Sequence, residues 1–191
     1  MKKYLIIAIT GLLLSVTSEA YALEITPGGL QQALASEAAT IVDLTLTGKG
    51  DARDLQYIST LPALRTLDMS GLQIVETKSD KAIHLSRHHF PANTLPAYIF
   101  SLSKLEKVVM PSTLTKIEEG AFASSNLNTV TFGASVKTIG SWAFYKTKLS
   151  SVVLPASTDS MGTGVFADCA NLSNAGLSAT QVTELLAKTF R

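Results

Sequence analysis

The sequence predicts an α/β solenoid: a right-handed superhelix with a parallel β-sheet on its concave face, short irregular convex turns and short capping helices. Three observations predict this fold. Phenylalanines recur at a constant interval, a short strand pattern recurs in step with them, and a segment of helical character lies at each end of the repeats. A unit as short as this interval cannot bury its own apolar face, so successive units must stack and cover one another.

The repeat is clearest in the second half of the chain. The regularly spaced phenylalanines are Phe100, Phe122, Phe144 and Phe166, and the small residues Ser103, Ser125, Thr147 and Cys169 keep the same interval. A strand core of the form L-x-x-V-x-Φ, where Φ is apolar, begins at Leu105, Leu127 and Leu149, and related cores occupy residues 41–46 and 64–69. We expect the valines to face inward and the phenylalanine rings to form a stacked column on the opposite side of the same core.

Residues 1–22 have the features of a cleaved export signal. Lys2 and Lys3 give a positive end, an apolar run follows, and Ala20-Tyr21-Ala22 is a small-x-small cleavage site. The apolar run is shorter than the roughly 20 residues that span a bilayer. We therefore expect cleavage near Ala22 and a mature protein that is secreted or held in the cell envelope, in the periplasm or on the outer surface. No membrane-spanning segment is expected after signal removal.

Short helices are expected at both ends of the repeats, because a solenoid otherwise exposes its first and last strands. Residues 23–40 carry apolar side chains at helical spacing and are predicted to form an N-terminal capping helix. Residues 179–191 follow a capping-box pattern and are predicted to form the C-terminal one. The repeats themselves occupy residues 41–178, and their period breaks at residues 71–94, which are either an irregular insertion or a degenerate repeat.

Charge and cysteine content exclude several classes of protein. Removing residues 1–22 takes away Lys2, Lys3 and Glu19, which leaves 14 basic and 14 acidic side chains out of the 16 and 15 in the full chain. A neutral chain with no basic run argues against a nucleic-acid partner. Cys169 is the only cysteine, so no intrachain disulfide can form, and stability outside the cytoplasm must come from packing.

The only group of residues with metal-site character is the histidine segment. His84, His88 and His89 lie close together in sequence, and the first two would share one face of a helix. An enzyme built on them would be a metal-dependent hydrolase. The run lacks an intervening glutamate and a defined helix, so we interpret it as an exposed polar loop. The sequence therefore predicts no enzyme, no cofactor and no bound metal.

Two further side chains are candidates for chemistry or contact. Cys169 occupies the position filled by serine or threonine in the other repeats, so we interpret it as a small core filler rather than a nucleophile. Trp142 lies two residues before a column phenylalanine. It is either an exposed contact point on the convex turns or a side chain packed over a neighbouring turn.

Several segments carry a resemblance to a known family. Residues 117–122, 139–144 and 161–166 read IEEGAF, IGSWAF and MGTGVF, each is followed by a strand core, and residues 61–70 look like a leading repeat. These segments resemble the BspA-like branch of the leucine-rich repeats, over about residues 41–178. The resemblance implies a leucine-rich-repeat solenoid that adheres to surface proteins of a host or of other bacteria.

The outward face of the strands is the surface that such a protein offers to a partner. By alternation along each strand, the candidate ligand-binding residues are Thr66, Asp68, Lys107, Val109, Thr129, Thr131, Ser151 and Val153. The leading hypothesis is a monomeric protein-binding or adhesion module whose partner is a protein or glycan of a host or bacterial surface. The alternatives are the metal-dependent hydrolase and a purely structural envelope component.

Overall fold

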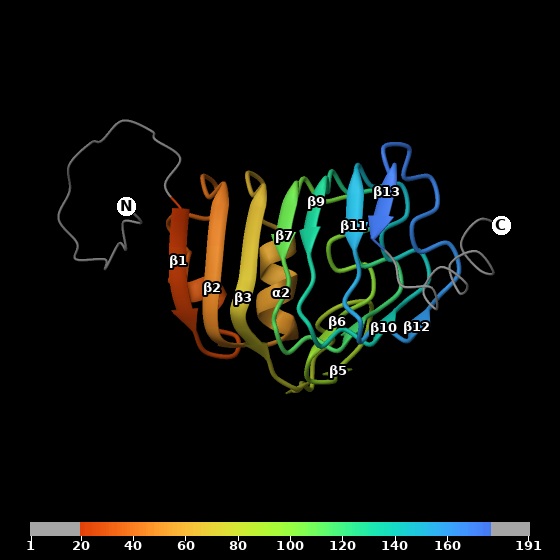
Figure 1. The fold of residues 1–191 in the computed structure, drawn as a ribbon. Helices are drawn as coiled ribbons and strands as arrows, with labels where there is room; N and C mark the ends of the chain where they lie inside the picture. Colours follow the sequence, from red (N-terminus) through yellow and green to blue (C-terminus); the bar gives the residue numbers. More distant parts are fainter. Residues whose placement is uncertain (1–19, 177–191) are drawn as a thin grey trace.

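Strands from successive repeats lie side by side in one row along the molecule, from β1 to β13 (Figure 1). The computed structural model describes residues 20–176. The row consists of β1 (Ala20–Ile25), β2 (Asp43–Gly50), β3 (Thr66–Ile74), β7 (Lys107–Val109), β9 (Thr129–Thr131), β11 (Ser151–Val153) and β13 (Asn174–Gly176). The first five form one parallel sheet in that order, and β11 pairs with β13 separately. The predicted parallel solenoid is confirmed.

A second parallel sheet closes the other side of the repeats, below the main row in Figure 1. Its strands are β6 (Thr94–Leu95), β8 (Lys116–Ile117), β10 (Thr138–Ile139) and β12 (Ser160–Met161). Each pair keeps the repeat register; Ile117, for example, lies beside Ile139, which lies beside Met161. Each repeat unit in this half of the chain therefore contributes one strand to the main row and one to the second sheet.

The strand cores face the interior as the alternation predicts. Leu67, Val108 and Val130 are neighbours in the ladder, and the first two are fully buried. Lys107 and Thr129, one residue earlier, are exposed. A pleated strand places successive side chains on opposite faces, so the L-x-x-V-x-Φ pattern alone sets which face is covered.

The phenylalanines form the expected column on the opposite side of the core. Ring centroids are 5.5 Å apart between Phe100 and Phe122, 5.4 Å between Phe122 and Phe144, and 5.5 Å between Phe144 and Phe166. The first three rings are fully buried. Phe132 packs edge-on against Phe144 at 5.6 Å, which joins the column to the strand side of the core.

The convex turns are held together by their own backbone ladder. The N–H groups of Tyr98, Phe100 and Leu102 donate to the carbonyl groups of Glu119, Ala121 and Ala123 in the next turn, and the pattern repeats once per unit. Two positions of each turn adopt positive φ. One comprises Tyr98, Gly120, Trp142 and Gly164, and the other comprises Leu102, Ser124, Lys146 and Asp168. In the turns that begin at Tyr98, Gly120 and Trp142, both of these positions and the phenylalanine between them donate their N–H groups to the following turn.

The N-terminal region differs from the prediction. Within residues 23–40 the expected capping helix is reduced to one turn, α1 (Leu30–Ala33), and residues 23–25 belong to β1, which extends the sheet beside β2. Leu30 and Leu34 are buried, so the apolar spacing that suggested a helix is satisfied by that single turn. A second helix that was not predicted, α2 (Ala52–Ser59), follows β2 and begins with a capping box of Asp51 and Asp54.

The remaining terminal predictions lie outside the described residues. These are the C-terminal capping helix over 179–191 and residues 1–19 of the export signal. Residues 20–22 of that signal form the start of β1. Within residues 20–176, no helix is both long and apolar enough to cross a bilayer.

Residues 71–94 contain a short antiparallel hairpin. The end of β3 leads into β4 (Thr77–Lys78), which pairs antiparallel with β5 (His89–Phe90), and the chain then enters β6. The N–H group of Asn93 donates to the Ile74 carbonyl at 2.9 Å and closes the base of the hairpin. Leu85, near the hairpin tip, is 54% exposed.

Candidate binding surface

The eight sequence-predicted site residues lie on the outer face of the strand row. Ladder pairing places Thr66, Lys107 and Thr129 in one line, and Asp68, Val109 and Thr131 in a second line two residues further along the strands. Ser151 and Val153 lie on the next strand in the row, β11, and Val153 is 73% exposed. The structure therefore brings all eight into one surface, which we call the strand face.

A cleft interrupts the strand face between β9 and β11. Its volume is about 500 Å³, and four of the predicted residues line it, namely Thr129, Thr131, Ser151 and Val153. Its remaining lining residues are Asn128, Val130, Phe132, Ala134, Ser150, Leu154 and Pro155. Hydroxyl groups and apolar side chains thus meet in one hollow between the last two strands of the predicted surface.

The cleft coincides with a break in the backbone ladder. Between β7 and β9, Thr129 donates its N–H to the Glu106 carbonyl at 3.1 Å, and Met110 donates to Thr131 at 2.9 Å. In the part of the chain that the structure describes, no equivalent bond joins residues 128–132 to residues 150–154. Contact between the turns resumes at Lys148, whose N–H donates to Leu127 at 2.9 Å. The cleft is therefore a local parting of the sheet, where the main-chain ladder between β9 and β11 is open.

The three histidines do not converge on one site. His84 packs against the solenoid, with Nδ1 2.6 Å from Gln56 Oε1 and Nε2 2.7 Å from the Ala97 carbonyl oxygen. His89 instead contacts Glu76, and His88 contacts the Ser79 carbonyl. The helix that would align His84 with His88 is absent, because both residues belong to the hairpin. Among residues 20–176, no group of three His, Cys, Asp or Glu side chains could hold a metal ion.

One carboxylate in the hairpin is affected by its neighbours. The hydrogen bond from His89 and the proximity of Lys78 lower the pKa of Glu76, which is exposed. The hairpin is also joined to the solenoid by Arg87, whose Nη1 lies 2.6 Å from Glu118 Oε2. The Arg87–Glu118 ion pair attaches the hairpin to the repeats, whereas the contacts of Glu76 lie within the hairpin.

Cys169 is half-buried and bonded within the repeat series. Its sulfur donates to the Phe144 carbonyl at 3.0 Å and lies 3.2 Å from the Thr147 hydroxyl. The thiol therefore bridges two turns at the position of the small-residue series. This placement agrees with its interpretation as a filler of that position.

Sequence reasoning recognised Trp142 but missed the residues around it. The indole is 45% exposed and covers Gly164 of the next turn, and the Tyr98 ring covers Gly120 in the same manner. The Tyr98 hydroxyl donates to Glu119, which raises the pKa of Tyr98, and Asp168 raises the pKa of Tyr145 in the same way. The signal was available in the sequence, since Tyr98, Gly120, Trp142 and Gly164 follow one another at the interval of the phenylalanines.

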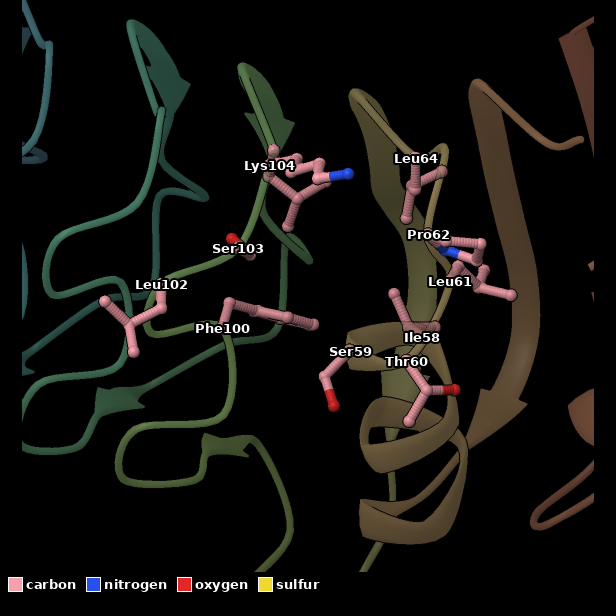
Figure 2. Close-up of a pocket in the computed structure, with 11 residues that line it drawn as sticks. Ile58, Ser59, Thr60, Leu61, Pro62, Leu64, Phe100, Leu102, Ser103 and Lys104 are labelled. Carbon is pink, nitrogen blue, oxygen red and sulfur yellow. The ribbon is translucent and has the colours of Figure 1, made fainter. Parts of the chain in front are cut away.

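A second hollow lies where α2 gives way to the phenylalanine turns. Figure 2 shows the end of α2 and the following residues on one side, with Phe100 and residues 102–104 on the other. Its volume is about 190 Å³. The column of rings begins at Phe100, so this hollow marks the change from one kind of turn to another. We assign no ligand to it.

Comparison with known proteins agrees with this architecture. The family described as "BspA type Leucine rich repeat region" matches residues 93–191 in six copies. The matched region is more than half of the chain. The chain belongs to this family. The first two strand cores, in β2 and β3, lie before the matched region and yet share the same sheet, so the solenoid extends beyond the part that the family pattern recognises.

Other similarities of this leucine-rich-repeat chain are distant. A leucine rich cell surface protein of known structure from Faecalibacterium prausnitzii A2-165 shares 18% sequence identity, with a TM-score of 0.29. The alignment covers 70% of this chain and 38% of that one, so this chain spans well under half of the other protein's length. Comparison with curated proteins gave no match.

Proposed function

We propose that this leucine-rich-repeat protein is an exported, non-catalytic module that binds another protein along its strand face. The observation that carries the proposal is the cleft between β9 and β11, which lies within the predicted surface and where the main-chain groups of residues 128–132 and 150–154 are not bonded to one another. Such groups are strong hydrogen-bonding partners, and an incoming polypeptide can satisfy them with its own main chain or side chains.

The composition of the strand face supports a protein partner. Short hydroxyl side chains from Thr129, Thr131 and Ser151 leave the main chain accessible, while Val153 adds exposed apolar area beside them. Repeat solenoids commonly use such extended faces for partner recognition. The proposed location is the cell surface or envelope, where binding would serve adhesion, and the protein is proposed to act as a monomer.

The proposal is tested with the chain expressed from Leu23 and immobilised for capture from envelope and host-matrix extracts. A double variant, T129R and V153R, places two bulky charges on either side of the cleft. The control is D159R, which adds the same side chain at an exposed position away from the strand face. Captured proteins are identified, purified and titrated against all three chains by calorimetry.

The expected result is at least one purified partner whose affinity falls tenfold or more for the double variant and is unchanged for the control. If every captured partner binds the double variant and the wild type with equal affinity, the strand face is not the surface that binds them. Sedimentation of the purified chain tests the monomer, and a stable higher assembly would favour a structural envelope component instead.

A further inference from the structure

We propose that the convex turns carry a second binding site, in which Tyr98 and Trp142 form an aromatic platform for an extended neutral glycan. This site lies on the turns between the two sheets and is separate from the strand face. It does not depend on the proposed protein partner. The platform rests on the backbone conformation of the turns, the spacing of the rings and the polar group beside Tyr98.

The turn does not require an aromatic residue at either position. Tyr98 and Trp142 adopt φ values of 54° and 54°, and Gly120 and Gly164 fill the equivalent positions at 59° and 62°. This left-handed region is strained for a bulky L-residue and free for glycine. The neighbouring turns show that glycine suffices to build the turn, so the two aromatic side chains are retained at a conformational cost. Strain of this kind is a reason to look for a function at the site.

The glycines make the platform possible. A Cβ atom on Gly120 would lie 2.2 Å from Tyr98 Cε1, and one on Gly164 would lie 2.6 Å from Trp142 Cδ1. Each ring therefore rests on the main chain of the following turn, where any other residue would displace it. The alternation of aromatic and glycine along the turns sets one ring on every second repeat.

The spacing of the rings indicates the class of ligand. Two turns separate Tyr98 from Trp142, which corresponds to about 10 Å at a strand spacing of about 4.8 Å. This is close to the length of one disaccharide in an extended β-1,4-linked glycan, so alternate sugar rings would reach successive aromatic rings. Side chains on one face of an extended peptide recur at about 6.7 Å, which does not match.

The polar group beside Tyr98 suits a hydroxyl group of a neutral sugar. Glu119 accepts a hydrogen bond from the Tyr98 hydroxyl. The carboxylate retains a second oxygen that can accept from a sugar hydroxyl. A carboxylate at the platform also disfavours an acidic glycan by like-charge repulsion. A polyproline helix, which repeats every third residue at about 9.3 Å, is the nearest competitor, but it docks into aromatic-lined grooves, and these rings lie outside both hollows described above.

The test uses cellohexaose and chitohexaose as probes, with a ten-residue polyproline peptide as the competing ligand. Trp142 is the only tryptophan, so its emission reports directly on this site. The variants are W142G and Y98G, which introduce the residue found at the same position in neighbouring turns and so preserve the fold. Thermal unfolding checks that preservation, and the strand-face variant V153R serves as the matched control.

The expected result is a blue shift of Trp142 emission with at least one hexasaccharide and binding measurable by calorimetry. Affinity should fall tenfold or more in W142G and in Y98G and should not change in V153R. The proposal is overturned if neither sugar binds at millimolar concentration, if folded W142G binds as well as the wild type, or if only the polyproline peptide binds. The platform and the strand face are separate surfaces, so failure of the glycan test would not contradict the proposed protein-binding function. Failure of the protein-capture test would likewise not contradict the proposed glycan site.

Discussion

Asp54 is a buried carboxylate that joins two segments of the N-terminal repeat. Its oxygens accept hydrogen bonds from the N–H groups of Gly28 at 2.8 Å, Leu30 at 3.0 Å and Asp51 at 2.9 Å. The same side chain therefore completes the capping box of α2 and satisfies the first turn of α1, whose own N-cap, Gly29, has no side chain to do so. The Asp54 carboxylate therefore stabilises the N-terminal ends of both α1 and α2.

Replacing Asp54 with asparagine should destabilise the protein by about 3 kcal/mol or more, because the amide keeps the shape but turns a donor toward main-chain N–H groups. The comparison is D159N, an exposed aspartate, which should change the free energy of unfolding by less than about 0.5 kcal/mol. Urea denaturation measures both. Equal unfolding midpoints for D54N and the wild type would show that the three hydrogen bonds do not stabilise the N-terminal repeat.

Tyr98 and Tyr145, on the convex turns, should lose their phenolic protons at a higher pH than an ordinary tyrosine. Hydrogen bonds to Glu119 and Asp168 raise the pKa of Tyr98 and Tyr145 above their ordinary value of 10.0. A raised pKa means that the neutral phenol is favoured in the folded state, so this stabilisation is complete below pH 10 and is lost as the pH rises through the folded-state pKa. Absorbance of tyrosinate should therefore develop in two phases, and Y98F and Y145F should each remove part of the later one. Titration of all tyrosines in one ordinary phase would contradict the expectation.

At the scale of elements, the hairpin should be dispensable for folding. Its base is anchored by Thr77 and Phe90, which are buried, whereas the tip is exposed. Replacing residues 79–88 with Asn-Gly joins Lys78 to His89 by a two-residue turn suited to an antiparallel pair. The loss of the contacts of His84 and Arg87 should cost about 1–2 kcal/mol.

Cooperative urea unfolding of the shortened chain is the measurement, and F90A is its comparison. Truncating buried Phe90 should cost about 3–5 kcal/mol, more than the loss of the whole tip. If the shortened chain fails to unfold cooperatively while F90A does, the hairpin is an integral turn of the solenoid and not an insertion.

How well elements could be predicted depended on whether they repeat. The phenylalanine column and the strand cores follow from a period that several positions share, so the stacking was specified several times over. The strand β1 occurs once, and its residues Ala20–Ala22 also fit a cleavage site, which hid its pairing with β2. The hairpin pairs only two residues per strand, too few for any alternation to be recognised.

The candidate site was predictable in part for the same reason. Alternation placed Thr129, Thr131, Ser151 and Val153 on the outer face. It could not predict the cleft between them, because residues 127–132 and 149–154 carry the same pattern as their neighbours while their ladder is open. That parting depends on how the two turns sit on each other, which the shared pattern does not specify. The platform on the turns was readable from the period, but only by aligning Tyr98 with Trp142.

At the scale of the whole molecule, stability should behave as a one-dimensional sum of turns and their contacts. Within the column, each phenylalanine contacts only the rings before and after it, at 5.4–5.5 Å. Phe144 also contacts Phe132, which lies outside the column, at 5.6 Å. Phe122 has a ring on both sides, whereas Phe166 has one described neighbour and is 6% exposed. Removing a ring from the middle should therefore disrupt two contacts, and removing one at the edge should disrupt fewer.

The quantitative expectation is that F122A costs about 3–5 kcal/mol and F166A costs less. The decisive comparison is between double variants. F122A with F144A removes two rings in direct contact, so their effects should depart from additivity by at least about 0.5 kcal/mol. F100A with F166A removes rings that are three turns apart, and their effects should add within about 0.5 kcal/mol. Urea denaturation of the four single and two double variants measures this. Equal coupling in the two pairs would mean that the core responds as one undivided unit, which a stack of turns in contact only with their neighbours does not allow.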